Sequence, residues 1–418
     1  MMRRIIFALA TVCLSAGFAS CSGEKEGNRI TELRLITMKP STGYSGEVAT
    51  VYGSNFGPDV KSNAVLINGA EGQILNASTG EIRFILPENE PGSYSIKVVT
   101  DNGEIEGLSF TYLRQPSHSY VVSTYAGTGS RGTADGIGTD ASFYLPSGLA
   151  MAPDGSIWIA DRGNNAIRRL GTDMMVTTVA SGNGLNAPWQ GGFDPDGNYF
   201  IASKGNSTVY KITPAGEMTT FATGINNPMG CVCDEAGNVY VASREGKKII
   251  RYTPDGSASD FTVFDNLTPN CVYRSKSGEF YTGDSSHHVI YQVSADGKTQ
   301  KIIAGDGASA SDWYDGDPGN ALSAAVGQVF GIDMDDNGVI YFVDAKYHTI
   351  RTITPDAGGD YAKGSVETIA GTGKGGYGNG VGLKAIFNTP YDVMVAPGGQ
   401  TIYVADVMNN VVRSITIR

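Results

Sequence analysis

Aromatic and amide side chains recur at one position of a repeat in the second part of the chain. The position follows a loop, and in five of the six repeats a proline directly precedes it: Ser147, Trp189, Met229, Asn270, Phe330 and Tyr391. Aromatic faces stack on sugar rings, while a few polar groups beside them fix a ligand by hydrogen bonds. Gln190, Asn270, Gln328 and Asp392 supply such groups. The set predicts a saccharide site, in which Trp189, Phe330 and Tyr391 stack the sugar. The alternative is that the aromatic residues only fill a channel and pack one repeat on the next.

A second recurring position carries positive charge in three consecutive repeats. Arg162, Lys204 and Arg244 each follow the Asp or Ser that ends a strand-like run. On a chain with a formal net charge of −11, a local arc of cations favours an anionic ligand such as a uronate or a sulfated glycan. The alternative is solvated charge that pairs with neighbouring carboxylates. The net charge argues against non-specific nucleic-acid binding, which needs clustered Lys and Arg.

Both positions are set by six copies of one pattern, which is a Gly turn followed by a β-branched or aromatic run that ends in Asp or Ser. The copies end at Asp161, Ser203, Ser243, Asp284, Asp344 and Asp406. A period near 40 residues is typical of a propeller, whose small sheets bury their faces only against neighbouring sheets. In that fold the two site positions share the top face, around the mouth of the central channel. The Asp-Gly turns then lie on the opposite face.

Residues 29–113 have a different pattern. Short alternating runs at 48–53, 63–67, 82–86 and 92–98 are separated by turns, which predicts a small β-sandwich. In this order the runs resemble the immunoglobulin-like IPT/TIG domain over essentially the whole segment. That resemblance implies a spacer or a binding module. Residues 114–120 are expected to form a linker.

Residues 121–418 resemble NHL-repeat propellers. The similarity rests on the segments 124–129 and 366–373, which share an Ala-Gly-Thr-Gly sequence, and on the Asp-x-x-Asn-Asn-x-Ile/Val-Arg runs at 161–168 and 406–413. It implies an all-β protein whose second domain is a six-bladed propeller. The run at 121–126 matches an outermost strand and the run at 411–417 a third strand. We therefore expect the two to pair in the sixth blade, which closes the ring and removes an exposed sheet edge.

Two long inserts, at 311–317 and 375–378, bring Trp313, Tyr314 and Tyr377 to the top face. Aromatic residues on exposed loops are a common device for ligand contact. Apolar residue pairs near the inserts support a different role, because they can bury their side chains in the blade and so anchor each insert to it. These pairs are Ala141 with Phe143, Ala325 with Val326, and Ala385 with Phe387.

The first 21 residues read as an export signal. Arg3 and Arg4 precede an apolar run that is too short to span a bilayer, and 18–21 resemble a bacterial lipobox. The resemblance implies a signal peptide at 1–21, a lipid on Cys21 and a tether at 22–28. The acidic tether resembles the export signal of Bacteroidetes surface lipoproteins, which places the protein on the outer membrane, exposed at the cell surface. Cys231, Cys233 and Cys271 are expected to be free thiols.

Several motifs are weaker than they look. Asp333, Asp335 and Asp344 match most of a calcium-loop pattern, but Asp344 ends a strand roughly 20 Å from the turn at Gly338. His288 and His348 share one register with Asn165 and Asn410, which favours turn chemistry over metal ligation. Six-bladed calcium lactonases hold an ion with Asn and Asp side chains at the central mouth. Only Asn270 and Asp392 are available for that role here.

Together these features favour a surface-anchored, non-catalytic protein that captures an extracellular polysaccharide or oligosaccharide on the top face of the propeller. The expected ligand residues line the mouth and the cation arc: Trp189, Gln190, Met229, Asn270, Gln328, Phe330, Tyr391, Asp392, Arg162, Lys204 and Arg244. We expect no cofactor, no nucleic-acid partner, and membrane contact only through the lipid; an outer-membrane uptake complex is a further partner to consider. One alternative is a hydrolase or lyase that uses a divalent metal at the channel. The other is a protein-interaction scaffold for the uptake complex.

Overall fold

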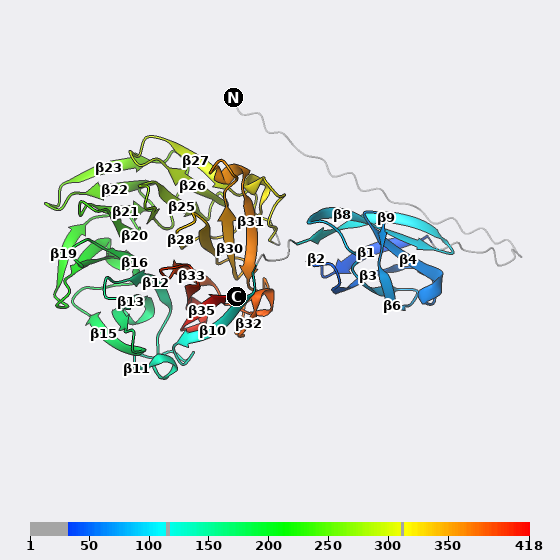
Figure 1. Ribbon diagram of the computed structural model, residues 1–418, viewed down its shortest axis with the longest axis horizontal. Coiled ribbons are helices and arrows are strands. Elements are labelled where there is room, and N and C mark those ends of the chain that lie inside the picture. The colour runs from blue at the N-terminus through cyan, green and yellow to red at the C-terminus, as the bar shows by residue number, and fades with distance from the viewer. Residues whose placement is uncertain (1–31, 114–117, 311–312) are drawn as a thin grey trace, which may run out of the picture.

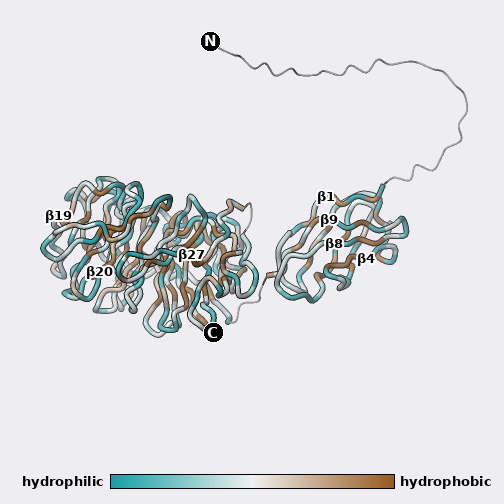
Figure 2. Tube along the Cα trace, turned by 90° about the horizontal axis from the view of Figure 1, so that it is seen from above, coloured by the Kyte–Doolittle hydropathy of each residue, from teal (hydrophilic) through white to brown (hydrophobic). Residues whose placement is uncertain are grey.

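The computed structural model describes residues 32–113, 118–310 and 313–418. These residues form two all-β units that lie side by side in both views (Figures 1 and 2). The predicted signal peptide, the lipidation site Cys21, the tether and most of the linker fall outside the described residues. Within the described ranges, no helix is long and apolar enough to cross a membrane.

The first unit is a sandwich of two sheets, as the alternating runs predict. One sheet has the order β1-β3-β7-β6, with β1 (Arg34–Lys39), β3 (Val48–Ser54), β7 (Glu81–Ile85) and β6 (Gln73–Ala77). The other has the order β2-β9-β8-β4-β5, with β2 (Thr42–Gly43), β9 (Gly103–Tyr112), β8 (Gly92–Thr100), β4 (Asn63–Ile67) and β5 (Ala70–Glu71). Alternate residues such as Val51, Val65 and Phe84 point inward and are fully buried between the sheets.

The second unit is a ring of six sheets, in which β12, β16, β20, β28 and β33 lie nearest the centre (Figure 1). Blade 1 consists of β12 (Pro146–Met151), β13 (Ile157–Asp161), β14 (Ala166–Leu170) and β15 (Met175–Ser181), with β11 (Gly136–Ile137) outside. Blade 2 consists of β16 (Pro188–Phe193), β17 (Tyr199–Ser203), β18 (Thr208–Ile212) and β19 (Met218–Thr223). Blade 3 consists of β20 (Pro228–Cys233), β21 (Val239–Ser243), β22 (Lys248–Tyr252) and β23 (Ala258–Val263).

Blades 4 to 6 complete the ring. Blade 4 consists of β24 (Tyr273–Arg274), β25 (Phe280–Asp284), β26 (Val289–Val293) and β27 (Gln300–Ala304). Blade 5 consists of β28 (Ile332–Met334), β29 (Ile340–Asp344), β30 (Thr349–Thr354) and β31 (Ser365–Ala370). Blade 6 consists of β33 (Pro390–Val395), β34 (Thr401–Asp406), β35 (Val411–Ile417), β10 (Tyr120–Ala126) and β32 (Gly380–Val381). The described part also contains eight three-residue 3-10 helices: η1 (Val60–Ser62), η2 (Gly138–Asp140), η3 (Arg162–Asn164), η4 (Lys204–Asn206), η5 (Ala321–Ser323), η6 (Tyr361–Lys363), η7 (Gly382–Lys384) and η8 (Val407–Asn409).

The ring closes through its first strand, as the sequence predicts. β10 pairs antiparallel with β35, from Tyr120 opposite Ile417 to Ala126 opposite Val412. Ser119 and Arg418 extend this pairing at one end, because the backbone N–H of each donates to the carbonyl oxygen of the other. Val122 is buried in the largest apolar cluster of the propeller. The first and last strands of the propeller therefore share one blade, and its third strand is not left as a free edge.

The conformational freedom of glycine explains why a Gly turn recurs in each repeat. Gly155, Gly197 and Gly338 have φ near +80°, a conformation that glycine adopts at no steric cost. Asp335 caps its turn by accepting the N–H groups of Asn337 and Val339. Asp344 instead accepts N–H groups from Gly327 and Gln328. The two ends of the calcium-like motif thus belong to different loops, in agreement with the sequence interpretation.

In all six blades, the residue at the corner that joins two outer neighbouring strands, such as β13 and β14, has a left-handed backbone. These residues have φ between +48° and +57°: Asn165, Ser207, Lys247, His288, His348 and Asn410. In three blades the side chain of this residue also accepts an N–H from the next blade. Asn165 accepts from Ala187, Asn410 from Leu145, and His348 Nδ1 from Thr389 at 2.9 Å. The predicted turn chemistry of His348 is therefore confirmed, and its ring also links blade 5 to blade 6.

This link predicts a pH-dependent stability. Burial lowers the pKa of His348 below its ordinary value, against the opposing charge of Asp344. Since the folded state favours the neutral ring, the bond to Thr389 is fully present above the unfolded pKa near 6.5, and is lost as the pH falls from there through the lowered folded pKa. We expect the native protein to lose about 1 kcal/mol relative to His348→Asn across this range, because asparagine is an acceptor that does not titrate.

The measurement is chemical unfolding of both proteins at several pH values between 7.5 and 5. Every other titrating group is common to the two proteins, so the difference between their curves isolates His348. Parallel curves would contradict the assignment of the link to the imidazole.

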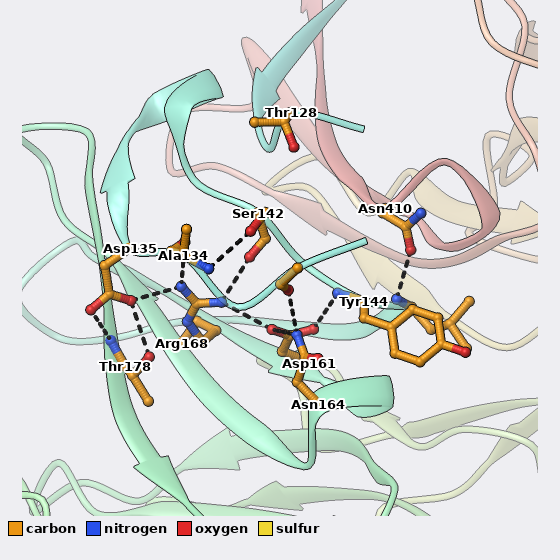
Figure 3. Close-up of polar contacts among 12 residues, drawn as sticks. Thr128, Ala134, Asp135, Ser142, Tyr144, Asp161, Asn164, Arg168, Thr178 and Asn410 are labelled. Carbon is orange, nitrogen blue, oxygen red and sulfur yellow. Dashed lines mark hydrogen bonds and ion pairs between the residues drawn. The ribbon is translucent and has the colours of Figure 1, made fainter. Parts of the chain in front are cut away.

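Buried arginines hold the longer blades together. In blade 1, Arg168 is 1% exposed and bonds Asp161 at 3.0 Å and Asp135 at 2.7 Å. It also donates to the carbonyl oxygens of Ser142 and Ala134, which fixes the insert before β12 (Figure 3). Arg351 and Arg413 occupy the same register in blades 5 and 6, where they bond Asp344 and Asp406. Blades 2 and 3 have Ser203 and Ser243 in place of the Asp.

The apolar residues of the inserts act as anchors. Phe143, Val326 and Phe387 are fully buried, as are their alanine partners or nearly so. Trp313 is not placed to contact a ligand as expected, because its side chain is only 6% exposed. It forms a cluster with Leu113 and Tyr347, and Tyr44 and Leu383 pack against this cluster. The blade 5 insert therefore contacts the first unit instead of offering Trp313 to a ligand, whereas Tyr377 remains 54% exposed.

Candidate functional site

The mouth-register side chains converge at the centre of the ring. Trp189, Phe330 and Tyr391 come from blades 2, 5 and 6, and their ring centroids lie 4.7 to 5.9 Å apart. Trp189 is 2% and Phe330 8% exposed, while Tyr391 is partly buried. Met229 is fully buried in the same cluster. We call Trp189, Phe330 and Tyr391 the aromatic plug.

The plug changes the expected role of its members. A ring that stacks on a sugar must offer an open face, and Trp189 has almost no exposed surface. Its role in this structure is to fill the channel, which is the alternative that the sequence left open. Tyr391 keeps part of its surface accessible. It is therefore the ring of the plug that is best placed to contact a ligand.

The polar residues of the mouth divide into a buried and an exposed group. Asp392 is 4% exposed. Its carboxylate accepts hydrogen bonds from Leu149 N–H at 2.7 Å, from Gln190 Nε2 at 2.7 Å and from the N–H of the following residue, Val393, at 3.0 Å. Burial raises the pKa of Asp392 well above its ordinary value, although these donors act in the opposite direction. Gln328 is exposed. Asp392 and Gln190 thus bond each other across the channel, and Gln328 remains available to solvent.

Asn270 is the most unusual member of the buried group. It is fully buried, and neither atom of its side-chain amide has a hydrogen-bond partner in the structure. Trp189 Nε1 and Gln190 Oε1 are also buried without a partner. Buried polar groups are nearly always satisfied by protein or by ordered water. The mouth residues Asn270, Trp189 and Gln190 thus carry buried polar atoms that no protein group satisfies.

Two of the three cations, Arg162 and Lys204, lie over the plug. The guanidinium of Arg162 is 4.9 Å from the Trp189 ring centroid and 5.2 Å from that of Tyr391, and Lys204 Nζ is 4.4 Å from Trp189. Arg162, Lys204 and Arg244 are all half-buried. Desolvation lowers the pKa of Lys204, and the charges of Arg244 and Arg162 lower it further. Each of the two arginines is thus close enough to Lys204 to repel its charge.

Local backbone geometry places these cations. Arg162 and Lys204 begin η3 and η4, and each of these turns ends in a left-handed residue. The N–H groups of Lys204 and Arg244 donate to the carbonyls of Ala187 and Asn227, which directly precede the prolines at the mouth. In blades 2 and 3 the cation corner and the mouth loop are therefore tied together by hydrogen bonds.

Sequence reasoning missed two residues of the mouth. Asn227 precedes Pro228, has φ of +54°, and its Oδ1 is buried without a partner while its Nδ2 donates to Glu245. Glu245 raises the pKa of Lys204 slightly against the larger effects that lower it. The signal was the position before the proline, where a polar residue faces the cation corner of its own blade.

Metal-ligand clusters and thiols are the other groups of the propeller that could react. The described residues contain no group of three or more His, Cys, Asp or Glu placed to hold a metal ion. Cys231, Cys233 and Cys271 are free thiols, as predicted. Burial raises the pKa of Cys271 to about 12. A thiol in such an environment is a poor nucleophile.

Two family models match parts of the chain. The IPT/TIG domain model matches residues 34–112, and the NHL repeat model matches residues 143–170, which lie in blade 1. No curated protein matches the sequence.

Solved structures from Bacteroides share the whole architecture. A structural genomics protein of unknown function from Bacteroides thetaiotaomicron is 22% identical with a TM-score of 0.61, over 94% of this chain and 99% of that one. An auxiliary nutrient binding protein from the same species is 21% identical with a TM-score of 0.60, over 93% and 98%. One from Bacteroides ovatus is 22% identical with a TM-score of 0.60, over 93% and 99%. At this level of identity the similarity shows the fold, which is an IPT/TIG-like sandwich followed by an NHL-like propeller.

Proposed function

We propose that the protein is a non-catalytic binding protein that captures extracellular polysaccharide at the top face of its propeller. The observation that carries the proposal is the mouth of the channel, where partly exposed Tyr391 and three half-buried cations surround a closely packed floor. Such a surface is held in place before a ligand arrives, which lowers the entropy lost on binding. Two Bacteroides proteins of the same architecture are described as auxiliary nutrient binding proteins, and this supports a nutrient as the ligand.

The geometry favours binding over chemistry. The carboxylate of Asp392 would be the natural general base or metal ligand of the mouth, but both of its oxygens already accept hydrogen bonds from N–H groups. A group that serves catalysis has to reach substrate, and Asp392 is 4% exposed below the aromatic plug.

The location belongs to the same proposal. An N-terminal lipid on Cys21 would hold the protein at the outer membrane, with the first unit as a spacer and the propeller facing the medium. An outer-membrane uptake complex would then receive the captured glycan. Incorporation of labelled palmitate, lost in Cys21→Ala, together with protease accessibility on intact cells, tests this part independently of the ligand.

The ligand is tested by affinity electrophoresis of residues 22–418 in gels that contain neutral or acidic polysaccharides. We expect at least one glycan class to retard the protein, and Tyr391→Ala to weaken the retardation about tenfold. Tyr52→Ala is the control, because it removes another partly buried tyrosine from β3 of the first unit, away from the mouth. Retardation by no polysaccharide, or equal retardation of the two variants, would contradict the proposal. Trp189→Ala is less suitable, since it opens a cavity in the channel.

A further inference from the structure

The cations at the mouth lack counter-charges. Lys204, Arg162 and Arg244 take part in none of the ion pairs within 4.0 Å among the described residues. Arg168, Arg169 and Arg274 of the propeller are paired, whereas Arg131 and Arg251 are, like the mouth cations, absent from these pairs. Glu245 is the one acidic residue that counteracts the lowered pKa of Lys204, and it is outweighed there by two arginines. What sets the mouth apart is that its positive charges act on one another, since two arginines shift the pKa of Lys204.

The cluster is also held in place. Arg162 and Lys204 lie on the faces of the aromatic plug, a contact that strengthens as the cation is desolvated. Arg162 Nε is buried without a hydrogen-bond partner, and so are Trp189 Nε1 beneath it and Asn227 Oδ1 at the neighbouring loop. The Trp189 side chain is 2% exposed. Two of these groups, Arg162 Nε and Trp189 Nε1, are donors without acceptors, and they lie beside the clustered positive charges, whereas Asn227 Oδ1 is an acceptor.

We propose that the mouth is a specific anion site, in which Arg162, Lys204 and Arg244 bind a carboxylate or sulfate group of the ligand. This deepens the proposed function by naming the class of polysaccharide, which is an acidic one. An oxyanion relieves the repulsion among the three cations and accepts charge-assisted hydrogen bonds from them. The planar guanidinium groups suit carboxylate and sulfate oxygens, and the lysine adds a point charge.

The test is isothermal titration calorimetry of residues 22–418 with polygalacturonate, dextran sulfate and neutral dextran. We expect binding of at least one acidic polymer, weakened more than fivefold when NaCl is raised from 50 to 300 mM, because salt screens exposed charges. Lys204→Met and Arg244→Met should each weaken it at least tenfold. Lys298→Met is the control, since it removes the same charge from an exposed turn between β26 and β27 on the opposite face.

The small anions distinguish the two proposals. Sodium galacturonate and sodium sulfate, compared with chloride at equal ionic strength, should raise the thermal midpoint of the native protein but not that of Lys204→Met. A shift with galacturonate alone identifies a carboxylate ligand, and a shift with sulfate alone a sulfated one. If neutral dextran binds as tightly as the acidic polymers and Lys204→Met has no effect, the anion site is wrong while the proposed function stands. If the small anions bind but no polysaccharide does, the reverse holds; if neither binds, both fall.

Discussion

Replacement of Arg168 by methionine is expected to lower the free energy of unfolding of the propeller by about 3–5 kcal/mol, the usual cost of leaving one buried charge without its partner. Arg168 is 1% and Asp161 0% exposed, so water cannot take over the role of the lost guanidinium. The carbonyls of Ser142 and Ala134 would lose their donor as well. Methionine fills a similar volume, which limits any contribution from a cavity.

The next residue in the same strand provides the control. Arg169 bonds Asp154 at 2.8 Å, but the side chains are 39% and 54% exposed. Arg169→Met should therefore cost no more than about 1 kcal/mol. Chemical unfolding followed by tryptophan fluorescence is well suited, because Trp158, Trp189 and Trp313 all lie in the propeller. Costs within about 1 kcal/mol of each other would refute the role assigned to the buried pair.

Val122→Asp should cost about 4 kcal/mol or more, because it places a carboxylate without a partner in an apolar core. Val122 is 1% exposed, lies opposite Ile415 and Gly380, and contributes to the largest buried cluster. The effect would fall on the strand that closes the ring. We therefore expect β10 to separate from β35 before the other blades open.

The adjacent Ser123 points to solvent, and Ser123→Asp should leave the stability within about 0.5 kcal/mol of the native value. Val122→Ala, at about 2 kcal/mol, gives a graded variant if the aspartate prevents folding. Limited proteolysis with N-terminal sequencing should detect early cleavage near residues 119–127 in Val122→Asp alone. Equal protection of this segment in all variants would mean that closure does not depend on the core contact of β10.

The sequence predicted the architecture well because its signals are local. Glycines at positive φ, alternating strands and a period near 40 residues each depend on a few neighbouring residues. The pairing of β10 with β35 followed from counting strands, since a blade one strand short must be completed by the other end of the chain. The left-handed corners at His288 and His348 were predictable because Asn165 and Asn410 stand at the same register.

The state of the site was harder to predict. Register places Trp189, Phe330 and Tyr391 at one level, but it does not give the width of the channel that they share. Whether such rings are open to a ligand depends on contacts across three blades that are far apart in the sequence. Trp313 shows the same limit, because its burial depends on Leu113 from the other unit. Burial of an insert residue between two domains leaves no periodic signal.

The closing strand also determines how the molecule carries mechanical load. The first unit is joined to the propeller through the segment that leads directly into β10 at Tyr120. Tension along the chain from the N-terminal side therefore enters the ring at one end of that strand. β10 is paired with β35 over its length and with β32 on its other side, so a pull along its axis shears many hydrogen bonds at once. The blade that completes the ring is thus also the one that first bears such tension.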